Sequence, residues 1–243
     1  AIQNLKPLTC KNPASFSYLA IDEPDIQHLL NQVPIEIKTC SNRRIKDRDK
    51  NEYYNVNSKH FISYNVFELL DKEYRKIYFD IDKFTIGFEE FNNVFLPKFK
   101  QTVKDVVKEY YTLINVELDP NITDDYFNPL VFVRNETDDD GNNLDIVKSV
   151  HIIYHKLRLE RMQNQQLSMI INSKIFNPSS KAKVDSLVYT RNRNYCLPKM
   201  TKVKDGNKRT FIPFDDYTRE QSEDYRHYLI NYTVDTIQIK YEP

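Results

Sequence analysis

Residues 75–82, RKIYFDID, place two aspartates at the end of an otherwise apolar run. The β-branched and aromatic side chains of this run predict a strand. Because side chains alternate across a strand, Asp80 and Asp82 point the same way. Phe79 and Ile81 then face the core. Two carboxylates on one strand face can chelate a hard divalent cation, but they can equally be solvated acids at a strand end.

The composition is that of an ordinary globular chain that carries no net charge. Its 243 residues are 40% hydrophobic and 29% charged, enough for one large domain or two closely packed lobes. With 35 basic and 35 acidic residues, the chain does not coat nucleic acid by bulk charge, although a local basic groove is compatible with this balance. No apolar run approaches the roughly 20 residues of a membrane helix, so we expect no membrane partner.

The cysteines and glycines exclude several classes of site. Three cysteines without a CxxC pair indicate neither a disulfide framework nor a zinc ribbon, and favour a reducing, intracellular compartment. The three glycines, Gly87, Gly141 and Gly206, form neither GxxxxGK[ST] nor GxGxxG. Because both phosphate-binding loops need clustered glycines, the chain by itself is neither a P-loop ATPase nor a nicotinamide enzyme.

Strands and helices are expected to alternate along the chain, with hairpins among them. The apolar and β-branched patterns predict strands at 35–40, 75–82, 130–135, 146–157 and 184–190, and a hairpin over 191–214 that turns at Asp205–Gly206. Helical spacing predicts helices at 25–33, from about Lys98 to Leu113, at 161–176 and at 220–234. Residues 41–58 read as a polar connection, and 61–70 as either helix or strand. The fold class is therefore α+β, a mixed α/β architecture.

A second polar group interrupts the apolar strand at 146–157. Alternation places Ser149 and His151 on one face, where a hydroxyl and an imidazole could donate hydrogen bonds to polyphosphate oxygens. Lys148 would have to reach around the strand edge. A lone histidine is more often buried and satisfied by its neighbours. His155, four residues on, would suit zinc on a helix, but the β-branched content and the lack of an HExxH glutamate argue against that.

A third acid precedes a basic segment. Asp185 is followed by basic side chains within a short aromatic stretch, namely Arg191, Arg193, Lys199 and Lys202. A carboxylate close to guanidinium groups is expected where metal ions and a triphosphate share one site. The alternative is a solvated basic hairpin.

Taken together, YFDID, SVHIIYH and DSLVYTRNRNYCLPK resemble the three motifs of the archaeo-eukaryotic primase superfamily, in that order. The third is most similar to the primase-polymerase (PrimPol) branch and the primases of large DNA viruses. The resemblance is concentrated in residues 61–82, 145–157 and 184–202. Two positions depart from the pattern: Cys196 stands where a further basic residue is expected, and Val147 where relatives place a lysine.

The resemblance implies a fold and a set of site residues. The fold is an RRM-like sheet packed with a second α/β module, in one catalytic domain over residues 1–243. Asp80, Asp82 and Asp185 would bind Mg²⁺ or Mn²⁺ for two-metal-ion catalysis. The residues implied or considered for nucleotide binding are Ser149, His151, Arg193, Lys202, Lys148, Arg43 and Arg44. Those considered for DNA binding are Arg191, Lys199 and Lys204.

The activity that the resemblance implies is template-dependent nucleotidyl transfer. The chain would act as a DNA primase or primase-polymerase that makes primers on single-stranded DNA from nucleoside triphosphates. A gap-filling or repair polymerase of the same superfamily, a metal-dependent nuclease and an inactive RRM-like nucleic-acid-binding module are the alternatives. With no P-loop of its own, the chain is expected to work with a helicase domain or subunit, as the N-terminal part of a longer primase-helicase. A viral protein of this kind would act in the host cytoplasm or nucleus.

Overall fold

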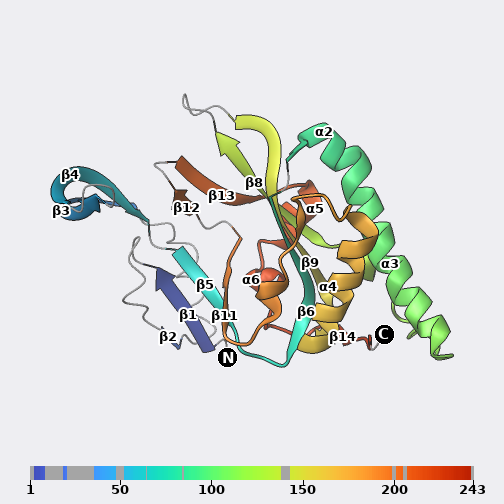
Figure 1. Ribbon diagram of the computed structural model, residues 1–243. Helices are drawn as coiled ribbons and strands as arrows, with labels where there is room; N and C mark the ends of the chain where they lie inside the picture. The colour runs from blue at the N-terminus through green and yellow to red at the C-terminus, as the bar shows by residue number, and fades with distance from the viewer. Residues whose placement is uncertain are drawn as a thin grey trace.

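The apolar strands assemble into one large, mainly antiparallel sheet in an α+β protein, seen in a computed structural model (Figure 1). The strands in order across this sheet are β10 (Lys183–Val184), β6 (Tyr74–Asp82), β9 (Asn143–Glu160), β8 (Leu130–Thr137), β13 (Asn207–Pro213) and β12 (Thr201–Lys204). Two short strands, β7 (Ile86–Gly87) and β14 (Ile237–Gln238), also pair with β9.

The structure describes most of the chain from residue 65 onward and separate segments before it. The described backbone covers residues 3–8, 19–20, 36–47, 52–63, 65–83, 85–137, 143–198, 201–204 and 207–241. Side chains are described for 68–83, 85–134, 145–193, 195–198 and 210–241. The helix expected at 25–33 lies outside these residues.

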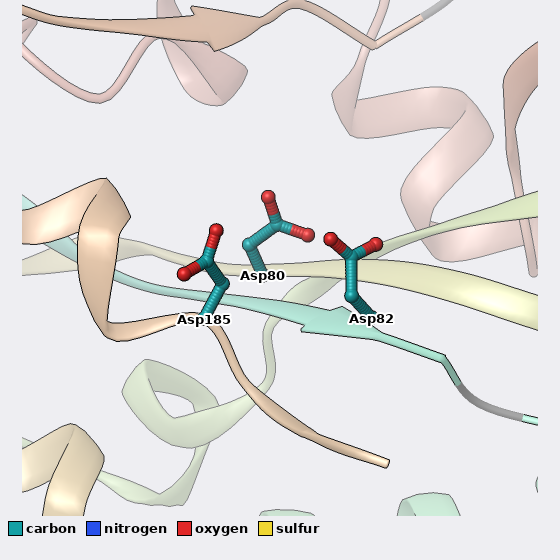
Figure 2. Close-up of side chains that lie close together, drawn as sticks. All are labelled: Asp80, Asp82 and Asp185. Atoms are coloured by element: carbon teal, nitrogen blue, oxygen red, sulfur yellow. The ribbon is translucent and has the colours of Figure 1, made fainter. Parts of the chain in front are cut away.

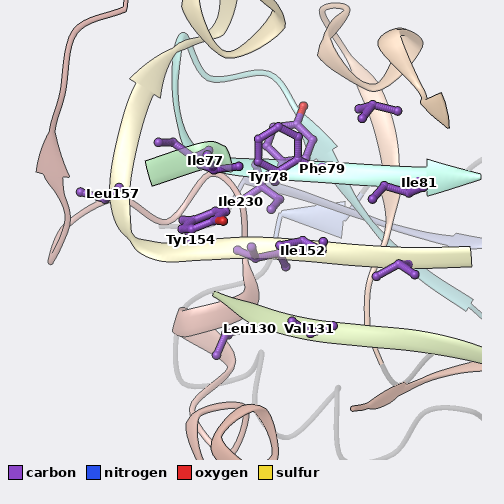
Figure 3. Close-up of a cluster of buried hydrophobic side chains, with 14 of the residues drawn as sticks. Ile77, Tyr78, Phe79, Ile81, Leu130, Val131, Ile152, Tyr154, Leu157 and Ile230 are labelled. Carbon is purple, nitrogen blue, oxygen red and sulfur yellow. The ribbon is translucent and has the colours of Figure 1, made fainter. Parts of the chain in front are cut away.

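Strand β6 is buried on both faces, which explains its nearly continuous apolar sequence. Ile77, Phe79 and Ile81 have no exposed surface, and neither does Tyr78 on the opposite face. Figure 3 shows these side chains packed with those of the neighbouring strands β9 and β8, and with Ile230 from the C-terminal region. The core thus holds β6 rigidly up to the two aspartates at its end.

One face of the sheet is covered by two long helices that lie together in Figure 1, α3 (Leu96–Leu113) and α4 (Arg161–Ile175). Phe99 of α3 meets Phe79 edge-on with ring centroids 5.1 Å apart. The helical run begins at Phe88, earlier than the expected start near Lys98. It passes through α2 (Phe88–Glu90) and a π-helical turn, η1 (Phe91–Phe95). This turn directly precedes Pro97, which has no backbone N–H to donate.

Three short helical segments also pack against the large sheet or its neighbours: η3 (Ser186–Tyr189), α5 (Asp216–Gln221) and α6 (Tyr225–Tyr228). The strand expected over 184–190 is wrong beyond Val184. Asp185 accepts a hydrogen bond from the Leu187 backbone N–H and so caps the 3-10 turn of η3. The long helix expected over 220–234 is also wrong, because Ser222 ends α5 and α6 ends at Tyr228.

A smaller sheet and a separate hairpin complete the described structure. The sheet has the order β11 (Arg193–Cys196), β5 (Asn65–Leu70), β1 (Gln3–Leu8) and β2 (Leu19–Ala20). The polar connection expected over 41–58 is wrong, since β3 (Glu36–Asp47) and β4 (Glu52–Ser63) pair in continuous antiparallel register. This hairpin projects from the body in Figure 1. The hairpin expected over 191–214 is confirmed only around Asp205–Gly206, as β12–β13 with Lys204 opposite Asn207. Its first part is wrong, because β11 pairs with β5 in the smaller sheet.

Buried charges fasten β5 and β6 to the C-terminal region. The Glu68 carboxylate, fully buried, accepts hydrogen bonds from the backbone N–H groups of Ile230 (2.8 Å) and Asn231 (2.7 Å). Lys76 is 2% exposed and donates to two backbone carbonyls of α6. Burial raises the pKa of Glu68 to about 7 and lowers the pKa of Lys76 to about 7.

Among the described residues, no helix combines the length and the apolar character of a membrane span.

Candidate metal centre

Three carboxylates from distant parts of the chain meet at the end of β6 (Figure 2). Strand β10 pairs antiparallel with β6, with Lys183 opposite Asp82, and the next residues extend this pairing. The Asp185 N–H donates to the Asp80 carbonyl over 2.8 Å. As a result Asp80, Asp82 and Asp185 each offer a ligand atom within 4.8 Å of the others. The convergence expected from the sequence is confirmed.

Each carboxylate is oriented by a neighbouring group. The Ser149 hydroxyl donates to Oδ1 of Asp82 over 3.0 Å. The Leu187 N–H donates to Oδ1 of Asp185 over 2.9 Å. His151 Nε2 lies 3.5 Å from Oδ1 of Asp80. Pairing of β6 with β9 places His151 directly opposite Asp80, so the expectation that Ser149 and His151 share one face is confirmed.

His151 is held between aromatic side chains. Its ring is 2% exposed and stacks on Phe211 of β13 and Tyr195 of β11, with centroids 3.8 Å and 4.6 Å away. Tyr195 belongs to the smaller sheet, so this imidazole lies where the two sheets meet. An imidazole fixed in this way has one orientation relative to Asp80.

A pair of tyrosines fixes η3 against β6. The Tyr78 hydroxyl donates to the Val188 carbonyl over 2.7 Å, and the Tyr189 hydroxyl donates to the Tyr78 carbonyl over 2.6 Å. Their rings are 5.0 Å apart and both are buried. These two bonds hold the segment that starts at Asp185, and thus position the third carboxylate.

The donor set fits a hard divalent cation. All three groups are carboxylates, the oxygen ligands that Mg²⁺, Mn²⁺ and Ca²⁺ prefer, and all three are half-buried. Three negative charges this close repel one another, and a bound cation would relieve that repulsion. The described cluster could therefore hold a metal ion and present it next to Ser149 and His151.

No protein-family model matches this chain, and no curated protein shows a significant sequence match to it. A functional assignment therefore depends on the residues and their geometry.

The basic residues expected at the site are less concentrated than the acids. Arg193 is exposed and occupies the same face of β11 as Tyr195. Arg191 is also exposed and lies 3.3 Å from the Glu73 carboxylate in a surface ion pair. Lys148 is half-buried and lies between Ser149 and Val147, where the register between β8 and β9 shifts.

The other expected basic residues are described in part. Lys202 and Lys204 belong to β12, at the edge of the large sheet, and Arg43 and Arg44 to β3 of the separate hairpin. Only the backbones of these four are described. Lys199 lies outside the described residues. The roles of these basic residues stay predictions.

Sequence reasoning missed Arg134. It lies in β8 directly opposite Ser149 and next to Phe211, whose ring centroid is 5.5 Å from its guanidinium carbon. Arg134 therefore shares the sheet face of the acids. It is half-buried, its Nε is buried without a hydrogen-bond partner, and no carboxylate among the described residues forms an ion pair with it. The signal was the arginine at the end of the apolar run LVFVR, but its strand partner could not be identified from sequence.

Proposed function

We propose that this protein is a template-dependent nucleotidyltransferase, a DNA primase or primase-polymerase of the archaeo-eukaryotic primase superfamily. The observation that carries the proposal is the meeting of Asp80, Asp82 and Asp185 beside Ser149 and His151. These five residues come from the three sequence motifs whose resemblance to that superfamily was noted above.

The acids would hold Mg²⁺ or Mn²⁺. When bound, such ions activate an attacking 3′-hydroxyl and neutralise charge on the reacting phosphates. The protein contributes the arrangement of its carboxylates, which are oriented before any ligand arrives by Ser149, by the Leu187 N–H and by the contact with His151. Such preorganisation reduces the reorganisation needed during the reaction.

The neighbouring strands supply groups for the nucleotide. Moving across the sheet from Asp82, the same face carries Ser149 and then Arg134. Arg134 and Asp82 lie two strands apart, so their backbones are about 10 Å from each other. Because the arginine side chain is long, a triphosphate bound near the acids could extend to its guanidinium group. Ser149, His151 and Arg134 would then bind the phosphates, with Arg193 and Lys202 as further candidates.

The fold supports the same proposal. An antiparallel sheet with α3 and α4 on one face leaves the opposite face to the acids, as expected for an RRM-like sheet. The smaller sheet that contains β11 would correspond to the second α/β module. The basic strands β12 and β13 lie at the sheet edge, where template DNA could bind. A helicase partner remains an expectation of the resemblance.

Unprimed synthesis on single-stranded DNA tests the activity. We expect the protein to make product from nucleoside triphosphates with Mg²⁺ or Mn²⁺ and no primer, ribonucleotides and deoxyribonucleotides being supplied separately. Asp82→Asn should lower the rate at least about a hundredfold, because it removes a metal ligand. Glu117→Gln, a change of the same kind at an exposed acid away from the site, should leave the rate unchanged.

The outcomes separate the alternatives. Product that forms only on a primed template indicates a gap-filling or repair polymerase. Degradation of DNA with Mg²⁺ and no nucleotides indicates a nuclease built on the same acids. Binding of single-stranded DNA without turnover indicates an inactive module. Each of these results, or full activity of Asp82→Asn, would contradict the proposal.

A further inference from the structure

A pocket lies along β9, away from Asp80, Asp82 and Asp185. Its volume is about 340 Å³, and the residues that form it include His155, His227, Lys76, Lys156, Tyr126 and Tyr232. His155 follows His151 by four residues on β9, so alternation places both on the same strand face, about 13 Å apart along the strand. Asp80, Asp82 and Asp185 take no part in the lining of this pocket, which includes two other acids, Asp125 and Asp235.

The pocket contains a buried imidazole, that of His155, without a hydrogen-bond partner. His155 is 5% exposed, and both of its ring nitrogens are buried without a hydrogen bond. The His227 ring lies 5.2 Å away, and its Nδ1 is 2.8 Å from the Gln221 carbonyl, to which it donates. Burial and the nearby charges of His227 and Lys76 lower the pKa of His155 to about 3, so this ring is neutral. A neutral imidazole offers one donor and one acceptor.

Two tyrosine–lysine pairs form the sides of the pocket. Lys156 Nζ lies 5.7 Å from the Tyr126 ring centroid, and Lys76 Nζ lies 5.9 Å from the Tyr232 ring centroid. Aromatic faces next to cations are the combination that binds a flat base together with its phosphate. Lys156 also contacts Asp125, whose side chain is 58% exposed, and an exposed ion pair of this kind is easily displaced.

The charges around this pocket do not favour a metal ion. Lys76, Lys156 and Arg226 line it and would repel a cation, and they outnumber the two acids of the lining, Asp125 and Asp235. Among the described side chains, no third histidine, cysteine or acid lies close enough to His155 and His227 to complete a metal site. The basic side chains, the two tyrosine rings and the unpaired imidazole favour a ligand with a negative charge, a flat ring and hydrogen-bonding edges.

We propose that this pocket binds a nucleotide. The base stacks on Tyr126 or Tyr232 and presents its hydrogen-bond donors and acceptors to His155. The phosphate replaces Asp125 as the ion-pair partner of Lys156. The nucleotide is either a free mononucleotide or one unit of a single-stranded nucleic acid. This site is independent of the acid cluster and does not depend on the proposed polymerase activity.

Calorimetric titration in the presence of EDTA tests the pocket without metal at the acids. One arm uses adenosine 5′-monophosphate and the other a single-stranded oligodeoxyadenylate of about ten residues. We expect saturable binding in at least one arm, weakened about fivefold or more by Tyr232→Leu and by Lys156→Gln. Lys174→Gln, which breaks a similar surface pair with Glu109, should leave the affinity unchanged.

The arms also identify the source of the nucleotide. Binding of the monophosphate indicates a free ligand, and binding of the oligonucleotide alone indicates a strand. No saturable binding in either arm, or binding that Lys156→Gln leaves intact, overturns the proposal. Lys156 is on the surface, so this variant remains informative if Tyr232→Leu fails to fold, and circular dichroism checks both.

Discussion

Arg134 is the described cation best placed to act with the three acids. If it binds phosphate, Arg134→Gln should raise the KM for nucleoside triphosphate about tenfold, because a hydrogen bond to a charged group contributes roughly 1.5–3 kcal/mol. The affinity for Mn²⁺ should not change, since the carboxylates are intact. Arg219→Gln, a similar change at an exposed arginine of α5, is the control. An unchanged KM in a variant that still polymerises would show that Arg134 does not contact the nucleotide.

Glu68 makes the stability depend on pH near neutrality. Burial raises its pKa to about 7 from an ordinary 4.5, so between these values the folded protein keeps a proton that the unfolded chain has lost. The free energy of unfolding therefore falls as the pH rises through this window, by on the order of 2 kcal/mol. Glu68→Gln cannot lose a proton and should lack this fall.

Urea unfolding of both proteins from pH 5 to 7.5 measures the effect. As the pH rises, the free energy of unfolding of Glu68→Gln should increase steadily relative to that of the wild type. Lys76, whose pKa burial lowers to about 7, acts above this window and in the opposite direction. A constant difference would show that Glu68 is ionised throughout.

The 3-10 segment η3 owes its position to side chains that carry no chemistry themselves. Tyr189→Phe removes the hydroxyl that bonds the Tyr78 carbonyl and should destabilise the protein by about 1 kcal/mol. It should also weaken Mn²⁺ binding several-fold, because Asp185 begins this segment. Tyr74→Phe, at an exposed tyrosine of the same strand β6, should change neither. Mn²⁺ titration and thermal unfolding would detect both effects, and an unchanged Mn²⁺ affinity would show that Asp185 is positioned without Tyr189.

The prediction of elements succeeded where one local pattern decides the structure. The strands at 75–82 and 146–157 and the helix at 161–176 were predicted because their periodicity agrees with their burial. The strand expected after Val184 failed because Asp185 caps a turn, and that depends on a hydrogen bond that β propensity does not reveal. The strand expected at 35–40 is the start of β3, but its continuation and β4 were missed because residues 41–58 are mostly polar and charged.

The site was predicted in proportion to how much of it lies in short motifs. Alternation within one strand was enough to pair Asp80 with Asp82, and Ser149 with His151. The arrival of Asp185 could be expected from the resemblance, but its cause is the pairing of β10 with β6. Arg134 needed the register between β8 and β9, which is a property of the folded sheet.

At the scale of the whole molecule, balanced charge should limit how strongly salt controls DNA binding. With 35 basic and 35 acidic residues, we expect a few local phosphate contacts, chiefly from the basic hairpin of β12 and β13. The plot of log affinity for single-stranded DNA against log salt should then have a slope of only about −2 to −3. Changing both Lys202 and Lys204 to Gln should reduce that slope by about 1.4, at 0.7 per contact. A slope of zero, or a slope that is the same in the double variant as in the wild type, would show that the DNA does not bind at β12 and β13.

The function proposed for β6 depends on which side of the sheet each of its side chains faces. Gaining or losing one residue between Ile77 and Asp82 would turn the acids towards α3 and bring apolar side chains out beside His151. Gaining or losing two residues would return Asp80 and Asp82 to their own face of the sheet, but would shift them by two residues relative to β9. We therefore expect this stretch to tolerate neither a one-residue nor a two-residue change of length.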